Sequence, residues 1–202
     1  MVRNSISKDI QSVSRIGYFV GGCMKKKRYN VDILSMSSIQ KLKKDLQSYQ
    51  NDLTRKCRLL AEKLTEKGIA VANAKIGESP LGKYVSIRTE ISEQKMGTKA
   101  IIIATGAVKQ SEGYEDFNTL LAIEFGAGIY HNSDANPNAD EFGLGVGTFP
   151  GQIHAFENGW YYWDDKAQEW RYTHGVKATM PMYNASVEIM QEIVKTAREV
   201  FA

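Results

Sequence analysis

A long stretch of helical periodicity near the N-terminus most constrains how this chain folds. From Ser37 to Lys67, apolar residues recur at spacings of three and four, which places them on one face of an α-helix. This stripe consists of Ile39, Leu42, Leu46, Tyr49, Leu53, Cys57, Leu60 and Leu64. Ser37 and Gln40 match a capping box, and Gly68 predicts the end of the helix. Because charged residues occupy the other faces, we expect this helix to lie against a sheet or a neighbouring subunit.

The regions flanking this helix are simpler. Residues 1–30 have no sustained period and end in a basic cluster, so they are predicted to form a mobile N-terminal arm, with Met24 as an alternative translation start. Residues 31–202 are long enough for one domain. A short helical continuation from Ile69 to Ala74 is compatible with the sequence, and the turn residues 79–82 close the helical region.

Residues 84–106 change to a period of two. Val85, Ile87, Thr89 and Ile91 alternate with polar residues, which predicts a strand with one buried face. Residues 94–98 form the predicted turn, and residues 99–105 the return strand. Its run Ala-Ile-Ile-Ile-Ala lacks alternation, so we expect a central strand that is covered on both faces, with the long helix on one side.

The middle of the chain holds an isolated acidic residue and a long loop. Glu124 lies in an apolar run that is compatible with a short helix or a strand. No second carboxylate or histidine accompanies it at a defined spacing, so we expect it to accept backbone N–H groups or to pair with a base. Residues 127–158 are rich in Gly, Asn, Asp and Pro, and a loop of this length is either functional or ordered only by a partner.

That loop contains two weak ligand-binding patterns. Residues 143–147 resemble a phosphate loop, but the expected strand and helix do not flank them, so no nucleotide is predicted. His131, Asp134, Asp140 and His154 match no known metal-ligand spacing, so no metal or other cofactor is predicted.

The C-terminal third begins with an aromatic hairpin. Trp160 to Trp163 and Glu169 to Thr173 flank a polar turn, and their aromatic residues suit cross-strand pairing. Pro181 then begins a helix whose apolar stripe continues to the end of the chain. Together these elements predict an α+β fold in which a long N-terminal helix and a C-terminal helix pack on a small antiparallel sheet, with a long Gly/Asn-rich loop and an aromatic hairpin.

The sequence offers little catalytic chemistry. It lacks a nucleophile elbow, a zinc-protease motif, a Cys-x-x-Cys pair and a Walker loop, and its three histidines lie in separate contexts, so we expect no enzymatic activity. His174 is the strongest candidate among them, with local hydrogen bonding as its expected role. Two cysteines in dissimilar contexts fit a reducing compartment. No apolar run approaches the ~20 residues of a membrane span.

Three segments resemble the phage head–tail joining family, the minor structural proteins also described as tail-completion or neck proteins of long-tailed phages and prophages. They are Ile-Gln-Lys-Leu-Lys-Lys-Asp-Leu at 39–46, Ile-Glu-Phe-Gly-Ala-Gly at 123–128, and Thr-His-Gly-Val-Lys-Ala-Thr-Met-Pro-Met-Tyr-Asn-Ala at 173–185. The resemblance covers about residues 36–202. It implies helices on one antiparallel sheet and a homo-oligomeric, six-fold ring between the head connector and the tail, in the virion, assembled in the host bacterial cytoplasm.

This resemblance supplies no catalytic residues, and it implies other neck, connector and tail proteins as partners. A net charge of +3 suits a ring through which DNA passes without sequence-specific binding. The residues expected at docking or subunit interfaces are Glu124, Phe125, Trp160, Trp163, Trp170, His174 and Tyr183. The open alternative is that the aromatic hairpin stacks on cell-wall carbohydrate or on single-stranded nucleic acid.

Overall fold

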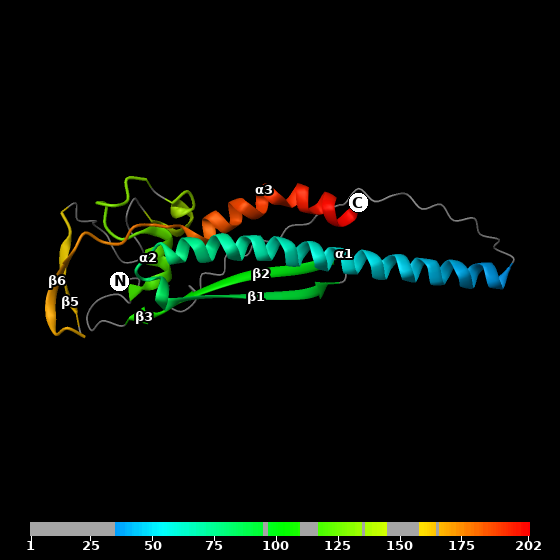
Figure 1. The fold of residues 1–202 in the computed structure, drawn as a ribbon, viewed down its shortest axis with the longest axis horizontal. Coiled ribbons are helices and arrows are strands. Elements are labelled where there is room, and N and C mark those ends of the chain that lie inside the picture. Colours follow the sequence, from blue (N-terminus) through cyan, green and yellow to red (C-terminus); the bar gives the residue numbers. More distant parts are fainter. Residues whose placement is uncertain (1–34, 95–96, 110–116, 135, 145–157, 165) are drawn as a thin grey trace, which may run out of the picture.

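The computed structural model describes residues 35–94, 97–109, 117–134, 136–144, 158–164 and 166–202. The predicted N-terminal arm, including Met24, lies outside these residues. The described part is an α+β structure, as the sequence predicts. A long helix α1 (Met36–Gly77) and a C-terminal helix α3 (Pro181–Phe201) pack with a β-hairpin, and smaller elements gather at one end (Figure 1).

Helix α1 runs from Met36 to Gly77, which is longer than predicted at both ends. Ser35, rather than Ser37, is the N-cap, and its hydroxyl accepts the backbone N–H of Ser38 at 3.4 Å. Gly68 does not end the helix. The continuation predicted beyond Ile69 is confirmed, and the chain leaves the helix at the Ser79–Pro80 turn, before the short 3-10 helix η1 (Gly82–Tyr84).

Gly68 is retained inside the helix because neighbouring elements approach it closely. A Cβ atom at this position would lie 2.7 Å from Cδ1 of Ile189 and 2.9 Å from Cδ1 of Ile102. These two side chains belong to different elements, Ile189 to α3 and Ile102 to the strand β2 (Gly97–Gly106), so both elements meet α1 at this glycine. The prediction of a helix stop was wrong because glycine here serves close packing and does not form a cap.

The predicted hairpin is confirmed, with strands β1 (Val85–Gln94) and β2 (Gly97–Gly106) paired antiparallel from Val85↔Gly106 to Gln94↔Gly97. The prediction that the return strand is central is wrong. Among the described residues β2 pairs with β1 alone, and only Ile102 and Ala104 of its apolar run are buried. The described strands form three separate two-stranded sheets, not one sheet.

Helix α3 (Pro181–Phe201) runs antiparallel to α1 and shares the main core with it and with the hairpin (Figure 1). The buried members of this core are Leu60, Leu64, Ile102, Ala104, Leu120, Met182, Ile189 and Val200. Lys67 of α1 forms an ion pair with Glu192 of α3. The core residues of α1 thus begin at Leu60, well inside the helix.

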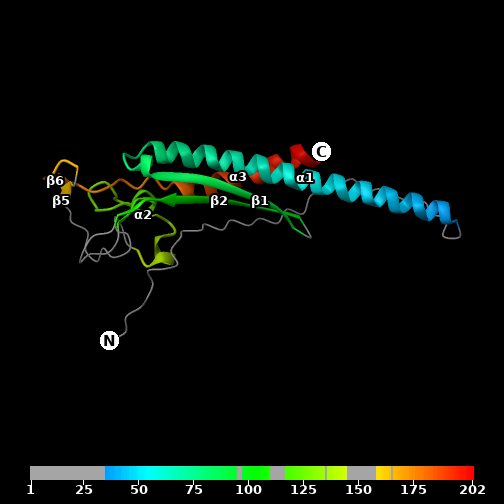
Figure 2. The ribbon, with the colours of Figure 1, turned by 90° about the horizontal axis from the view of Figure 1, so that it is seen from below.

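The N-terminal part of α1 extends past both α3 and the hairpin, as both views show (Figures 1 and 2). We call residues 36–57 the α1 overhang. Two members of its apolar stripe are exposed, Ile39 at 42% and Leu46 at 47%, as is the neighbouring Met36 at 70%, and the others are half-buried. The stripe predicted from the sequence therefore continues beyond the part of the helix that packs in the core of the described residues.

The small elements lie at the opposite end. Strands β3 (Val108–Lys109) and β4 (Phe117–Asn118) pair, and the Asn118 side chain caps α2 (Thr119–Phe125), so the apolar run around Glu124 is a helix. The described part of the long loop includes the 3-10 helix η2 (Ala139–Phe142), and Ala139 and Leu144 form a second small core with Leu121 and Phe125.

The aromatic hairpin is confirmed as β5 (Trp160–Asp164) and β6 (Glu169–Thr173), at the end of the molecule opposite the overhang. In the described part of the chain, no helix has the length and apolar character needed to cross a membrane.

Candidate functional site

Glu124 lies at the centre of a buried junction between α2 and α3. Its side chain is 8% exposed and points at the N-terminus of α3. One carboxylate oxygen accepts the backbone N–H of Met182 at 2.9 Å, and the other accepts that of Tyr183 at 3.0 Å. These are among the N–H groups that a helix leaves without an internal partner in its first turn. Glu124 therefore caps α3 from a distant part of the chain, in agreement with its predicted role as an acceptor of backbone N–H groups.

Backbone contacts complete this junction. The carbonyl of Ile123 accepts the N–H groups of Thr179 and Met180, and Ala127 forms a two-way bridge with Val176. Met180, the residue before the helix, has a left-handed backbone with φ 52°. A non-glycine residue adopts that conformation only where its surroundings compensate for the strain. The hydrogen bonds around Ile123 and Glu124 supply that compensation.

Two buried asparagines hold the same junction from the loop. Asn132 donates from Nδ2 to the carbonyls of Gly128 and Val176, and its Oδ1 accepts the N–H of Ala178 at 2.7 Å. Asn136 donates to the side chain and to the backbone carbonyl of Glu124. Sequence reasoning missed both residues, because asparagine in a Gly/Asn/Pro-rich loop is normally exposed and no periodicity distinguishes these two. The described part of this loop is thus fixed within the chain.

Burial raises the pKa of the Glu124 carboxyl above its ordinary value, and the hydrogen bonds from Met182, Tyr183 and Asn136 oppose that shift. All three groups are donors that fit a carboxylate acceptor. Phe125 is also buried, and its ring lies 5.2 Å from that of Phe142. This placement corrects the assignment of Glu124 and Phe125 to a docking surface. Both stabilise the subunit from inside.

The aromatic hairpin presents one face of rings to solvent. Residues opposite each other in an antiparallel pair share a face, so Tyr161 and Tyr172 lie beside Trp163 and Trp170. We call these four residues the aromatic face. The Trp163 and Trp170 rings pack edge to face at 5.7 Å, and the two tyrosine rings at 5.1 Å. Yet Tyr161 is 67% exposed and Trp170 66%, so the face does not fill the described core.

Neighbouring rings extend this face toward the junction. His174 packs against Tyr172 at 5.1 Å and stacks on Tyr130 at 4.1 Å, and Tyr130 is 60% exposed. Within the described structure the Nδ1 atom of His174 is buried without a hydrogen-bond partner, so the predicted local hydrogen bonding of His174 is not seen at that atom. The local turn is instead closed by Thr173, whose hydroxyl accepts the N–H of Gly175.

The remaining predicted residues occupy different positions. Trp160 lies on the other face of the hairpin, and its indole is so close to Gly128 and Gly175 that a Cβ atom on either would approach it within about 3 Å. Tyr183 is half-buried in the first turn of α3 and reaches Glu124 through its backbone. The structure therefore groups Trp163, Trp170 and His174 with the exposed rings, and Trp160 with the fixed base of the hairpin.

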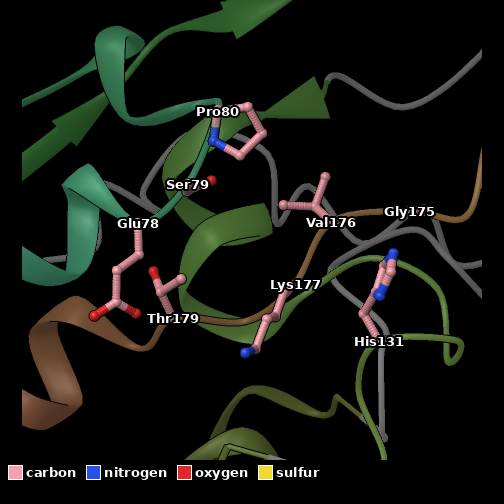
Figure 3. Close-up of a pocket in the computed structure, with 8 residues that line it drawn as sticks. All are labelled: Glu78, Ser79, Pro80, His131, Gly175, Val176, Lys177 and Thr179. Carbon is pink, nitrogen blue, oxygen red and sulfur yellow. The ribbon is translucent and has the colours of Figure 1, made fainter.

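A shallow hollow lies beside the junction (Figure 3). It is lined by Glu78, Ser79, Pro80, His131, Gly175, Val176, Lys177 and Thr179. Figure 3 shows the ammonium group of Lys177 directed away from the His131 ring, on the side of Glu78 and Thr179. The titratable groups therefore do not converge on a common point where a substrate could be held.

Among the described residues, no group of three or more His, Cys, Asp or Glu side chains is placed so that it could hold a metal ion. His131, Asp134 and Asp140 are exposed, and His154 lies outside the described residues. The chain matches no protein-family model, no curated protein and no solved structure.

Proposed function

We propose that this chain is a structural virion component that completes the tail or joins it to the head of a long-tailed phage or prophage, by ring assembly and docking and without catalysis. The observation that carries the proposal is the buried junction. The segments 123–128 and 173–185, on which the resemblance to the head–tail joining family rests, meet there through Glu124 and the bridge between Ala127 and Val176.

The exposed rings support an assembly role. Contiguous apolar patches on a soluble chain mark interaction sites, and Trp and Tyr are enriched at the centres of protein interfaces. The aromatic face stands on a hairpin that contributes no residue to either described core cluster. Its rings are therefore available to a neighbouring protein without disturbing the fold of the subunit.

A deletion strain of the phage or prophage tests the role. Without the protein, induced cells should yield DNA-filled heads and separate tails, and a plasmid copy should restore joined particles. Normal infectious particles from the deletion strain would rule the role out. Trp170→Ser should fail to restore joining, whereas Tyr162→Ser, on the opposite face of the same hairpin, should restore it.

The second candidate is an aromatic module for cell-wall carbohydrate or single-stranded nucleic acid, and the exposed rings of the aromatic face favour it specifically. Pull-down on purified cell walls and titration with single-stranded oligonucleotides test it directly. Binding that persists after Trp163→Ala and Trp170→Ala would exclude the aromatic face as the binding surface.

A further inference from the structure

We propose that the α1 overhang of one copy docks on the hairpin end of the next copy, so that identical chains associate head to tail. The hairpin end comprises α2, η2 and the β5–β6 hairpin. This inference rests on the proposed function, because a neck protein of that kind acts as a ring of copies. It names the two surfaces that would form the ring.

The overhang has the properties of one half of an interface. It is roughly 22 residues long, about 33 Å at 1.5 Å per residue. Ile39, Leu42, Leu46, Tyr49 and Leu53 alternate at spacings of three and four along one side, which suits packing of the helix on another surface. Lys43 lies beside this stripe, four residues after Ile39 and three before Leu46. A helix with such a face normally buries it.

The hairpin end has the properties of the other half. It carries the aromatic face, together with the exposed rings of Tyr130 (60%) and Phe142 (48%). Aromatic rings accept both aliphatic side chains and lysine ammonium groups, the two kinds of side chain along the overhang.

Charge complementarity favours a second copy as the occupant. The overhang contains five Lys or Arg residues against two Asp residues. Between Lys109 and Lys166 the sequence has ten Asp or Glu residues and no Lys or Arg. Among the described members of that acidic stretch, Asp134, Asp140 and Glu141 are exposed at the hairpin end. The described charges of the β5–β6 hairpin balance, with Asp164 and Glu169 against Lys166 and Arg171, so the acidic part of the hairpin end is the region around η2. A basic overhang and an acidic η2 region favour head-to-tail contact between identical copies.

The shape of the subunit also favours contact between copies. The overhang (blue) and the hairpin (yellow to orange) lie at opposite ends of the long axis in both views, so they cannot meet within one chain (Figures 1 and 2). An interface between two different surfaces of the same subunit repeats from copy to copy and closes into a ring where the rotation permits. Such an interface differs from a two-fold dimer, in which the same surface of both copies meets itself.

The association of the purified full-length chain tests this interface, measured by sedimentation velocity over a range of concentrations. Association should weaken as salt rises from 10 mM to 500 mM, because screening shortens the reach of charges from about 30 Å to a few ångströms. The pair Lys43→Glu and Lys56→Glu should lower the association constant at least tenfold, and so should the pair Asp140→Lys and Glu141→Lys. Arg88→Glu with Lys99→Glu, on the β1–β2 hairpin, is the matched control and should change little.

Combining both reversed pairs in one chain is the decisive experiment, since it restores opposite charges with their signs exchanged. Recovery of association to near the wild-type value supports the docking. Trp170→Ser and Leu46→Gln should each weaken association as well, while thermal unfolding stays at the wild-type temperature.

Several outcomes would overturn the inference. A chain that stays monomeric at every concentration and salt would do so, as would an overhang covered by residues 1–34 of its own chain. If only the overhang variants lose association, the overhangs of two copies pair with each other. If only the hairpin-end variants lose association, the hairpin ends of two copies pair with each other.

The deletion strain separates this inference from the proposed function. If the protein is needed for joining and yet the charge exchange fails to restore association, the function stands and the docking surfaces are wrong. If the exchange succeeds and the deletion strain makes normal particles, the docking stands and the virion role is wrong.

Discussion

Removing the Glu124 carboxylate should destabilise the chain by releasing the N-terminus of α3. In Glu124→Ala, the N–H of Met182 and one N–H of the Asn136 amide lose their acceptor while they remain buried, whereas the N–H of Tyr183 is only partly buried. A buried donor without a partner costs roughly 1–3 kcal/mol. Two of them, partly offset because a buried carboxyl is no longer desolvated, give a loss of about 3 kcal/mol in the free energy of unfolding.

For a chain of this size, about 3 kcal/mol corresponds to a fall in Tm of roughly 6–12 °C, measurable by calorimetry or circular dichroism. Glu124→Gln should lie between the wild type and Glu124→Ala. Its amide oxygen still accepts from Tyr183 and Asn136, but its NH₂ group faces the N–H of Met182. Glu141→Gln, an exposed carboxylate in the nearby η2, is the matched control and should leave Tm unchanged.

Amide hydrogen exchange locates the effect. The amides of Met182 and Tyr183 should exchange faster in Glu124→Ala than in the wild type, while those of β1 and β2 change less. Wild-type Tm in Glu124→Ala, or uniform loss of protection without an excess at the start of α3, would refute the capping role.

Three further predictions concern the same core and junction. Burial raises the pKa of Glu124, so the folded state holds the carboxyl proton more tightly than the unfolded state does. The stability of the wild type relative to Glu124→Gln, measured by urea titration, should therefore fall as pH rises from about 4.5 through the raised pKa. A stability difference in favour of the wild type that grows with pH would show that the hydrogen bonds outweigh burial. Asn132→Ala removes three hydrogen bonds and should cost about 2–4 kcal/mol by denaturant unfolding, and an unchanged midpoint would contradict its role in holding the loop. Gly68→Val should cost about 1–3 kcal/mol by overpacking, whereas Gly77→Ala, with no atom within 4 Å of the new Cβ, should be neutral or stabilising; equal stabilities of the two variants would contradict close packing at Gly68.

The sequence predicts those parts of the fold that local patterns determine. The spacing along α1, the alternation from Val85 and the paired aromatics of β5–β6 each identify an element, because one buried face leaves a period in the sequence. The prediction that α1 ends at Gly68 is wrong, because a glycine can either stop a helix or allow close packing, here with the side chains of Ile189 and Ile102. Local sequence does not distinguish these two uses.

The junction was predictable only in part. The isolation of Glu124 indicates a structural acceptor, but its donors in Met182 and Tyr183 lie 58 and 59 residues away, and no local pattern links such positions. Asn132 and Asn136 have even less signal, because their burial depends on how the loop folds over α2. The prediction that Glu124 and Phe125 lie on a docking surface is wrong for a similar reason. The sequence shows that the segment is unusual, but it does not show whether the segment is buried in the subunit or exposed on its surface.

The periodicity of α1 also shows the limit of sequence reasoning about interfaces. Its stripe continues without interruption from Ile39 to Leu64, so the sequence alone does not show at which residue packing in the subunit core begins. In the structure, the buried core residues of α1 begin at Leu60, while Ile39 and Leu46 remain exposed. A helix keeps an apolar stripe beyond its own core only at a cost in solubility, unless another surface covers it. The basic overhang and the acidic residues around η2 are the reason for proposing a second copy as that surface.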